Sequence, residues 1–431
     1  MYYGFPVLVA ATVGGIITAP GQSACIGKVI YFIGAGIKEA KDQVIWHYHR
    51  QTFYSAAALL CMGPVIDKFG PRRCVVAIAL GLAYGCYRLA QVQSMEDLLI
   101  ALFMLRFFGQ GFLMTLAVVQ INYWWVKRRN VMFGISGACV SLVMLNLVPT
   151  FMDSIQSLED VRQTYTKMGA ICVFFMAPWG FLWYRDRPER YGVQPDGEKG
   201  SSALQVPESW TGYEALCTCS FWVFAFAQLS MAMTYEALCY HFDNLFDGTL
   251  SASEVSRLKV FMGWSTILTQ VVSGHILNRI EARWLMIRAL LVSAASLLLA
   301  CTMSGVDVGR SAVLSFGVLS TVSAGLGLTI FSVIYASYFG REHLGTIQTV
   351  ATSFAMFGCA IGPQIWEVIR VRYNSFMPGF ALGAFLQILC AFAVASKWAR
   401  PLQKTQKGGY MAVEVGDQLS FDDSTDEESG N

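Results

Sequence analysis

Long, continuously apolar runs recur along almost the whole chain, and they constrain the fold more than any other feature. Of the 431 residues, 55% are hydrophobic and 14% are charged, against roughly 25% charged residues in a soluble domain. Such runs predict membrane-spanning helices, because a helix satisfies its own backbone hydrogen bonds in lipid. The composition excludes a soluble enzyme, and a net charge of +2 excludes the basic surface that nucleic acid binding requires.

Twelve spans are predicted, six in each half of the chain. They are expected at about residues 4–34, 51–68, 74–94, 98–126, 131–152, 165–184, 219–242, 255–278, 284–303, 311–338, 346–368 and 376–398. The predicted class is therefore all-α: a polytopic membrane protein with two pseudo-symmetric six-helix bundles, at 1–184 and 219–400. A cytoplasmic central loop at 185–218 joins them, and an acidic cytoplasmic tail at 401–431 is expected to be disordered.

The distribution of basic residues orients these spans. Connectors after even-numbered spans carry clusters of Lys and Arg, whereas the others contain more acidic residues. Both termini are therefore expected in the cytoplasm, with the protein in the plasma membrane or an organellar membrane. The first span lacks a basic n-region and a small-residue cleavage site, so we expect a retained span rather than a signal peptide. His47 and His49 are expected in the outer connector between the first two spans.

A short motif recurs at matching places in the two halves. The sequence reads GPVIDKFGPRR at 63–73, after the second span, and GHILNR at 274–279, after the eighth. The glycine permits close helix approach, the Asp can accept hydrogen bonds from a helix N-terminus, and the arginines can bind carboxylates or lipid phosphate. We predict a conformational latch made of Gly63, Asp67, Lys68, Gly70, Arg72, Arg73, Gly274, Asn278 and Arg279.

The motif at 63–73 resembles the signature between helices 2 and 3 of the major facilitator superfamily. RFFGQG at 106–111 is similar to a second signature of that family, in its fourth helix. Within the superfamily, PGQS at 20–23, RPERYGVQPDG at 187–197 and YFGREHLG at 338–345 look like the monocarboxylate-porter and oxalate/formate-antiporter-like branch. The resemblance implies the major facilitator fold and a transporter in the lipid bilayer, not an enzyme, with no cofactor or metal.

Polar residues inside the apolar runs are the candidate site residues. Arg106 is the best-buried cation. It could bind an anion or bias the protonation of a nearby carboxylate. Alternatively, it ties helix 4 to backbone carbonyls of helix 1. Glu236, which shares a helix face with Tyr240, is the candidate proton-coupling group together with Arg106; alternatively it lies in water near the outer end. The predicted substrate-binding residues are Arg106, Gln22, Gln120, Tyr235, Gln270 and Tyr335.

These patterns predict a secondary active transporter that moves a small organic solute across the membrane by alternating access. The resemblance favours a monocarboxylate or related organic anion, with proton coupling or exchange. Gln270 stands where anion-carrying members of the branch place a basic residue, so a neutral or amphipathic solute stays open, as does a non-transporting sensor or scaffold. The tail offers a Tyr-x-x-bulky pattern at 410–413 and an acid-directed kinase pattern at Ser424, which predict sorting or kinase partners.

Overall fold

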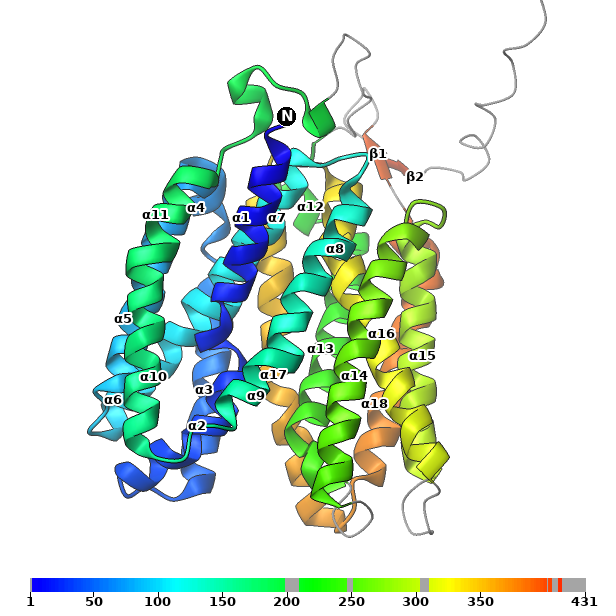
Figure 1. The fold of residues 1–431 in the computed structure, drawn as a ribbon. Helices are drawn as coiled ribbons and strands as arrows, with labels where there is room; N and C mark the ends of the chain where they lie inside the picture. Colours follow the sequence, from blue (N-terminus) through cyan, green and yellow to red (C-terminus); the bar gives the residue numbers. More distant parts are fainter. Residues whose placement is uncertain are drawn as a thin grey trace, which may run out of the picture.

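The structure is a computed structural model that describes residues 2–197, 209–245, 251–302, 310–400, 402–404 and 410–412. Within these residues the regular secondary structure is helical apart from two strands of three residues each. The all-α prediction is therefore confirmed. The helices lie roughly parallel to one another (Figure 1), as they must to cross a bilayer together.

In the described part of the chain, six helical passes make up the first half. Most consist of two or three consecutive segments, of which η1 is a 3₁₀-helix and η2, η3 and η4 are π-helical. The segments are α1 (Gly4–Ile17), η1 (Ala19–Gly21) and α2 (Ser23–Gly36); α3 (Lys41–Leu59) and α4 (Gly63–Phe69); α5 (Pro71–Ala90); α6 (Met95–Met104), η2 (Leu105–Leu113) and α7 (Met114–Trp124); α8 (Arg129–Leu142), η3 (Val143–Leu147) and α9 (Val148–Met152); and α10 (Leu158–Ile171), η4 (Cys172–Met176) and α11 (Ala177–Trp183).

The second half has longer, mostly uninterrupted helices. The segments between the halves are η5 (Pro188–Tyr191), η6 (Pro195–Gly197) and α12 (Gly212–Leu216). The helices that follow are α13 (Cys219–Leu245), α14 (Ala252–Ile276), α15 (Ala282–Thr302), α16 (Arg310–Phe339), α17 (Leu344–Tyr373), α18 (Met377–Ala395) and η7 (Lys397–Ala399). In the predicted tail, β1 (Leu402–Lys404) pairs antiparallel with β2 (Tyr410–Ala412). Residues 405–409 and 413–431, with the kinase pattern at Ser424, lie outside the described residues.

Nine stretches in the described residues are long and apolar enough to cross a membrane. The other three long helices, α3, α13 and α14, carry more polar side chains, among them His49, Glu236 and Lys259. They nevertheless run alongside the apolar helices in the same assembly (Figure 1). His49 is buried and Glu236 is half-buried, which lowers the cost of these side chains in the membrane, and Lys259 is exposed near the start of α14, where its long side chain can extend toward the membrane surface. These three helices therefore still fit the twelve-span prediction.

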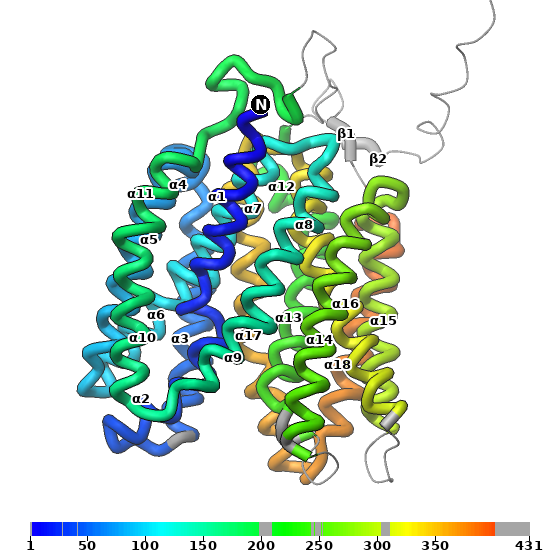
Figure 2. Tube along the Cα trace, in the orientation of Figure 1, coloured from blue at the N-terminus to red at the C-terminus, as the bar shows by residue number. Residues whose placement is uncertain are grey.

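The helices of each half gather into a bundle, and the two bundles stand side by side (Figures 1 and 2). Within the second bundle α13 packs on α17, and α15 packs on α16 and α18; between the bundles α8 packs on α14, and α3 packs on α17. We call the end that holds the α4–α5 connector and η5 the basic end. The basic residues there include Lys68, Arg72, Arg187 and Arg341.

One expected boundary is wrong. The sequence predicts His47 and His49 in the connector before the second span, but α3 begins at Lys41 and includes both. His49 is buried, and its ring lies 5.5 Å from the ring of Tyr240 on α13. The first ten residues of α3 are too polar to stand out as an apolar run, and tertiary packing makes them helical nonetheless.

Candidate functional site

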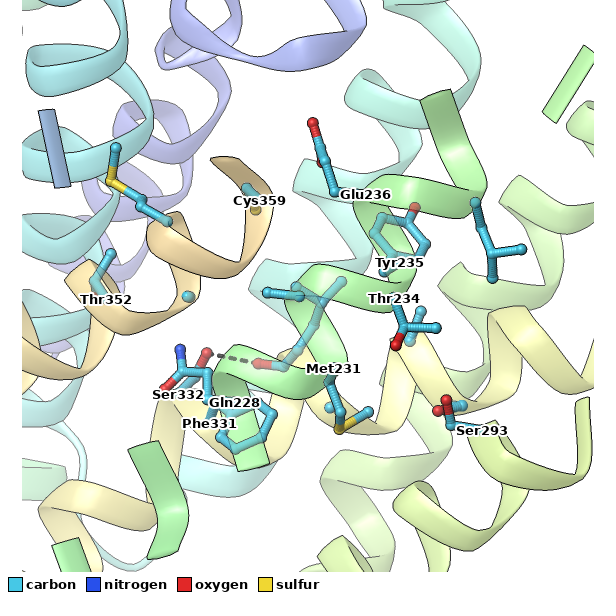
Figure 3. A pocket seen from close by; sticks show the side chains of 18 of the residues that line it. Gln228, Met231, Thr234, Tyr235, Glu236, Ser293, Phe331, Ser332, Thr352 and Cys359 are labelled. Atoms are coloured by element: carbon cyan, nitrogen blue, oxygen red, sulfur yellow. Dashed lines mark hydrogen bonds between the residues drawn. The ribbon is translucent and has the colours of Figure 1, made fainter. Parts of the chain in front are cut away.

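A cavity of about 310 Å³ lies between the two bundles. This volume falls within the range of pockets that bind small molecules. The first half contributes residues next to α2, in η2 and in α7, whereas α13, α15, α16 and α17 supply the larger share (Figure 3). The cavity is therefore asymmetric, with most of its wall in the second bundle.

Uncharged polar groups and apolar side chains together line this cavity. The amides are Gln22, Gln110, Gln228 and Gln348, and the hydroxyls come mainly from serines. Met114, Met231, Leu297, Phe331 and Met356 are among the apolar residues. Among the described lining residues Glu236 is the one charged side chain, and no Lys, Arg or His lines the cavity. Such a surface suits a solute with both polar and apolar parts.

Glu236 is joined to the first bundle through Ser23. The Ser23 hydroxyl, at the first residue of α2, donates a hydrogen bond to the Glu236 carboxylate on α13. The same oxygen accepts hydrogen bonds from the Tyr48 hydroxyl at 3.0 Å and from the Arg106 Nη1 at 3.1 Å. Ser23 therefore uses its one donor and both lone pairs, and it connects a buried cation with the carboxylate of the cavity.

Arg106 lies behind the cavity wall and is fully buried. Its Nε donates to the Thr52 hydroxyl at 3.0 Å, its Nη1 also donates to the Gly21 carbonyl at 3.1 Å, and its guanidinium lies 5.1 Å from the centre of the Tyr48 ring. Arg106 belongs to the π-helical segment η2, and such segments often occur at functional sites. The bond to Gly21 ties helix 4 to helix 1, and the bond to Ser23 leads to the carboxylate.

The structure brings three of the predicted site residues to the cavity. Gln22, Tyr235 and Glu236 line it. Tyr335 is buried behind the wall, where its hydroxyl donates to the Gln228 amide oxygen at 3.0 Å.

Gln120 and Gln270 are also buried away from the cavity lining. No hydrogen-bond partner in the described chain satisfies either polar atom of the Gln120 amide. The Gln270 amide packs against Gly137, at the crossing of α8 and α14, and its oxygen has no hydrogen-bond partner. Gln270 therefore belongs to a contact between helices, and Gln120 is buried without lining the cavity.

Several lining residues were not identified from the sequence. Gln110 belongs to the RFFGQG motif, and its amide lies 3.8 Å from the Cys359 sulfur. Gln228 sits in the apolar run of α13, where an isolated amide is a detectable signal. The serines of α15 and α16 give a weaker sequence signal, because a serine in an apolar helix usually donates its hydrogen bond to a backbone carbonyl of the same helix.

The first copy of the repeated motif contacts the second bundle at the basic end. The Asp67 carboxylate accepts hydrogen bonds from the backbone N–H groups of Gly345 and Thr346, both at 2.9 Å, and from the Thr346 hydroxyl at 2.6 Å. It thereby caps the N-terminus of α17. A Cβ atom on Gly63 would lie 2.3 Å from the Thr346 Cα, so only glycine permits this approach of α4 to α17.

The second copy makes the corresponding contact with the first bundle. A Cβ atom on Gly274 would lie 2.7 Å from the Asn130 carbonyl oxygen, and the Asn278 side-chain oxygen accepts a hydrogen bond from the Asn130 amide at 3.1 Å. Each copy thus contacts the bundle of the other half.

The remaining motif residues of the same end are Gly70, which is buried, and four basic residues that are exposed or half-buried. Arg72 donates to the Phe181 carbonyl at 2.9 Å, Lys68 lies over the Phe69 ring, and Gly70 ends α4. Arg73 and Arg279 are exposed. A further link between the bundles is the hydrogen bond from Arg341 Nη1 to the Tyr123 carbonyl at 2.6 Å, and the same guanidinium pairs with Glu189 of η5 at 2.6 Å.

Parallel membrane helices, two bundles and a cavity between them define a multi-pass membrane transporter. Residues 23–363 match the model of the Major Facilitator Superfamily, and the chain belongs to this superfamily of secondary transporters, which are not enzymes. The predicted superfamily and fold are confirmed. The assignment of this chain to the monocarboxylate-porter and oxalate/formate-antiporter-like branch stays a prediction.

Three solved structures are similar over nearly the whole chain. The human organic anion transporter MFSD10 (TETRAN) has 13% identity and a TM-score of 0.68, covering 91% of this chain and 99% of that one. FucP in the outward conformation has 11% identity and a TM-score of 0.66, covering 92% and 99%. The proton:xylose symporter XylE, bound to 6-bromo-6-deoxy-D-glucose, has 12% identity and a TM-score of 0.71, covering 90% and 94%. These likenesses establish the fold alone. A search of curated protein sequences finds no match.

Proposed function

We propose that the protein is a proton-coupled secondary transporter of a small, uncharged, amphipathic organic solute. The composition of the cavity wall carries the proposal, because its described residues include amides, hydroxyls and apolar side chains but no basic group. A buried anion without a cationic partner costs several kcal/mol, on the order of the whole binding energy of a small solute. An uncharged solute has no such cost.

Glu236 is the proposed proton-coupling group. It is the one charged residue of the described lining, and Ser23 connects it to Arg106. Protonation neutralises the carboxylate and alters its bond to Ser23 in the other bundle. A proton on Glu236 therefore changes the contact between the bundles, as coupling by alternating access requires. The positive-inside rule supports a cytoplasmic location for the basic end and for both termini.

An organic anion is the second candidate substrate, and Arg106 favours it. The Nη2 atom of this buried guanidinium has no hydrogen-bond partner in the described chain. When Glu236 is protonated, the Arg106 guanidinium no longer has a negative charge connected to it through Ser23. An anion and a proton taken up together would restore the charge balance, as in the carboxylate transport that the sequence resemblance implies.

Uptake into proteoliposomes tests the proposal. The labelled solutes are a monocarboxylate (lactate), a dicarboxylate (succinate) and two neutral compounds (mannitol and the glycerol ether of phenol), each with and without an imposed proton gradient. We expect uptake of a neutral compound and stimulation by the gradient. Glu236→Gln should abolish the stimulation. The control Glu159→Gln alters an exposed carboxylate of α10 and should keep it.

The same assay separates the two candidates. Uptake of lactate or succinate but of neither neutral compound would overturn the uncharged-solute proposal, and loss of that uptake in Arg106→Gln would establish the anion alternative. Gradient stimulation that survives in Glu236→Gln would overturn the role of Glu236.

A further inference from the structure

Part of the cavity wall is formed by hydroxyl residues of the second bundle. Ser293 and Ser296 come from α15, Ser320 and Ser323 from α16, and Thr234 from α13. We call these five residues the serine pocket. In Figure 3 Thr234 and Ser293 lie together, apart from Glu236. Because Thr234 and Glu236 are two positions apart on one helix, their side chains diverge by about 200°.

The hydroxyl hydrogens of four of these residues are already committed within the protein. Thr234 donates to the Ser230 carbonyl at 3.0 Å, and Ser323 donates to the Ala289 carbonyl at 3.0 Å. Ser320 donates to the Phe316 carbonyl at 2.8 Å, which leaves Ser296 to donate to Ser320 at 2.6 Å. A hydroxyl has one hydrogen and two lone pairs, so these groups offer acceptors to a ligand.

Ser293 is the exception, and it points to a ligand. Its side chain is about nine-tenths buried and lines the cavity, and its hydroxyl makes no hydrogen bond within the described chain. This hydroxyl opens onto the cavity, so a bound polar group can pair with it, and such a hydrogen bond contributes about 0.5–1.5 kcal/mol. Gln387 of α18 donates to the Thr234 hydroxyl at 3.1 Å and holds this side of the pocket in place.

We propose that the serine pocket binds a hydroxyl group of an uncharged solute, which donates its hydrogen bond to a serine oxygen and accepts one from Ser293. This inference rests on the proposed function and deepens it, since it names the group of the solute that is recognised. A carboxylate would find one free donor, Ser293, among several acceptors. An ammonium group would find no carboxylate, because Glu236 points away from the pocket and is bonded to Ser23.

Binding of three matched probes to the purified full-length protein tests the inference. The probes are the glycerol ether of phenol, which has two hydroxyls on an aromatic body, its di-O-methyl derivative, which keeps the acceptors but has no donor, and the corresponding primary amine. Dissociation constants are measured by isothermal titration calorimetry in detergent. We expect the diol to bind at least about tenfold more tightly than either of the others, because the di-O-methyl derivative loses two hydrogen-bond donors and the ammonium group of the amine would be buried without a counter-charge.

Three variants then locate the site. Ser293→Ala removes a hydroxyl that has no partner in the protein, so it should weaken diol binding about three- to tenfold without lowering thermal stability. Ser293→Thr keeps the hydroxyl and should retain binding. Ser315→Ala, at an exposed position of α16, should bind the diol as the parent does.

Each outcome decides the question. Absence of diol binding to the parent, equal binding of the di-O-methyl derivative, or unchanged binding in Ser293→Ala would overturn the serine pocket. The uptake assay is independent of these measurements. If neutral solutes are transported with proton stimulation but the diol and its methylated derivative bind alike, only the pocket assignment fails. If charged solutes alone are transported, the proposed function fails.

Discussion

Replacement of Asp67 by Asn tests the contact at the basic end. The carboxylate accepts three hydrogen bonds from Gly345 and Thr346 at the start of α17. An Asn side chain keeps one oxygen but turns an NH₂ group toward N–H donors, so at least one bond is lost. The negative charge at the helix N-terminus is lost as well.

The magnitude follows from these contacts. A hydrogen bond to a charged group contributes about 1.5–3 kcal/mol, and a charge at a helix N-terminus contributes about 0.3–1 kcal/mol. Because Asp67 is only half-buried, we take the lower values, which sum to about 2 kcal/mol. About 1.4 kcal/mol corresponds to a tenfold change in an equilibrium constant. The equilibrium between the conformation in which the bundles touch at the basic end and the one in which they are separated there should therefore shift about thirtyfold toward separation.

Spin-label distance measurements detect this shift. Phe69 and Trp284 are exposed residues near the basic end, one in each bundle, and labels can be attached there through an encoded ketone amino acid. This choice avoids the 12 native cysteines. We expect a longer-distance population in Asp67→Asn. Glu96→Gln, an exposed carboxylate in the first turn of α6, is the control. If the longer-distance populations of the two variants agree within twofold, Asp67 does not hold the bundles together.

Three further predictions concern packing and the cavity. Gly63→Ala brings a Cβ to 2.3 Å from the α17 backbone and should lower the free energy of unfolding by about 2 kcal/mol. Gly27→Ala, with no neighbouring atom within 4 Å, should leave it unchanged. Equal thermal midpoints of the two variants would contradict this. Arg106→Lys keeps the charge but loses the planar fork, so a drop in thermal midpoint is expected, and an unchanged midpoint would argue against the bonds described. Tyr335→Phe frees the Gln228 amide and should raise the KM of uptake about threefold while kcat holds; an unchanged KM would count against this.

The fold was largely predictable because its strongest determinant is a length of apolar sequence. The class of the protein and the number of spans follow from bilayer thickness and from the cost of exposing polar backbone to lipid. The start of α3 was missed because the run from Lys41 to Arg50 is polar and becomes helical through its contacts. Hydropathy describes the lipid-facing helices well and underestimates helices that face other protein.

The site was less predictable, because the sequence does not say which face of a helix meets a cavity. Glu236 was recognisable as an isolated charge in an apolar run, and it lines the cavity. Gln270 gave a similar signal but faces Gly137 at a helix crossing. Ser293 gave almost none, because its position depends on how α15 packs against α13 and α16. Packing between distant helices decides such cases.

The contacts of Ser23 and Asp67 join the same two bundles at different depths. Asp67 lies at the basic end, whereas Ser23 lies beyond α1, whose 14 residues span about 21 Å. In the proposed mechanism, protonation of Glu236 neutralises the carboxylate that Ser23 contacts and leaves the Asp67 contact unchanged. Proton binding should therefore favour separation at the end away from Asp67. Glu236→Gln mimics the protonated form, so labels across that end should report longer distances in this variant at any pH; distances that match the parent at high pH would refute the coupling.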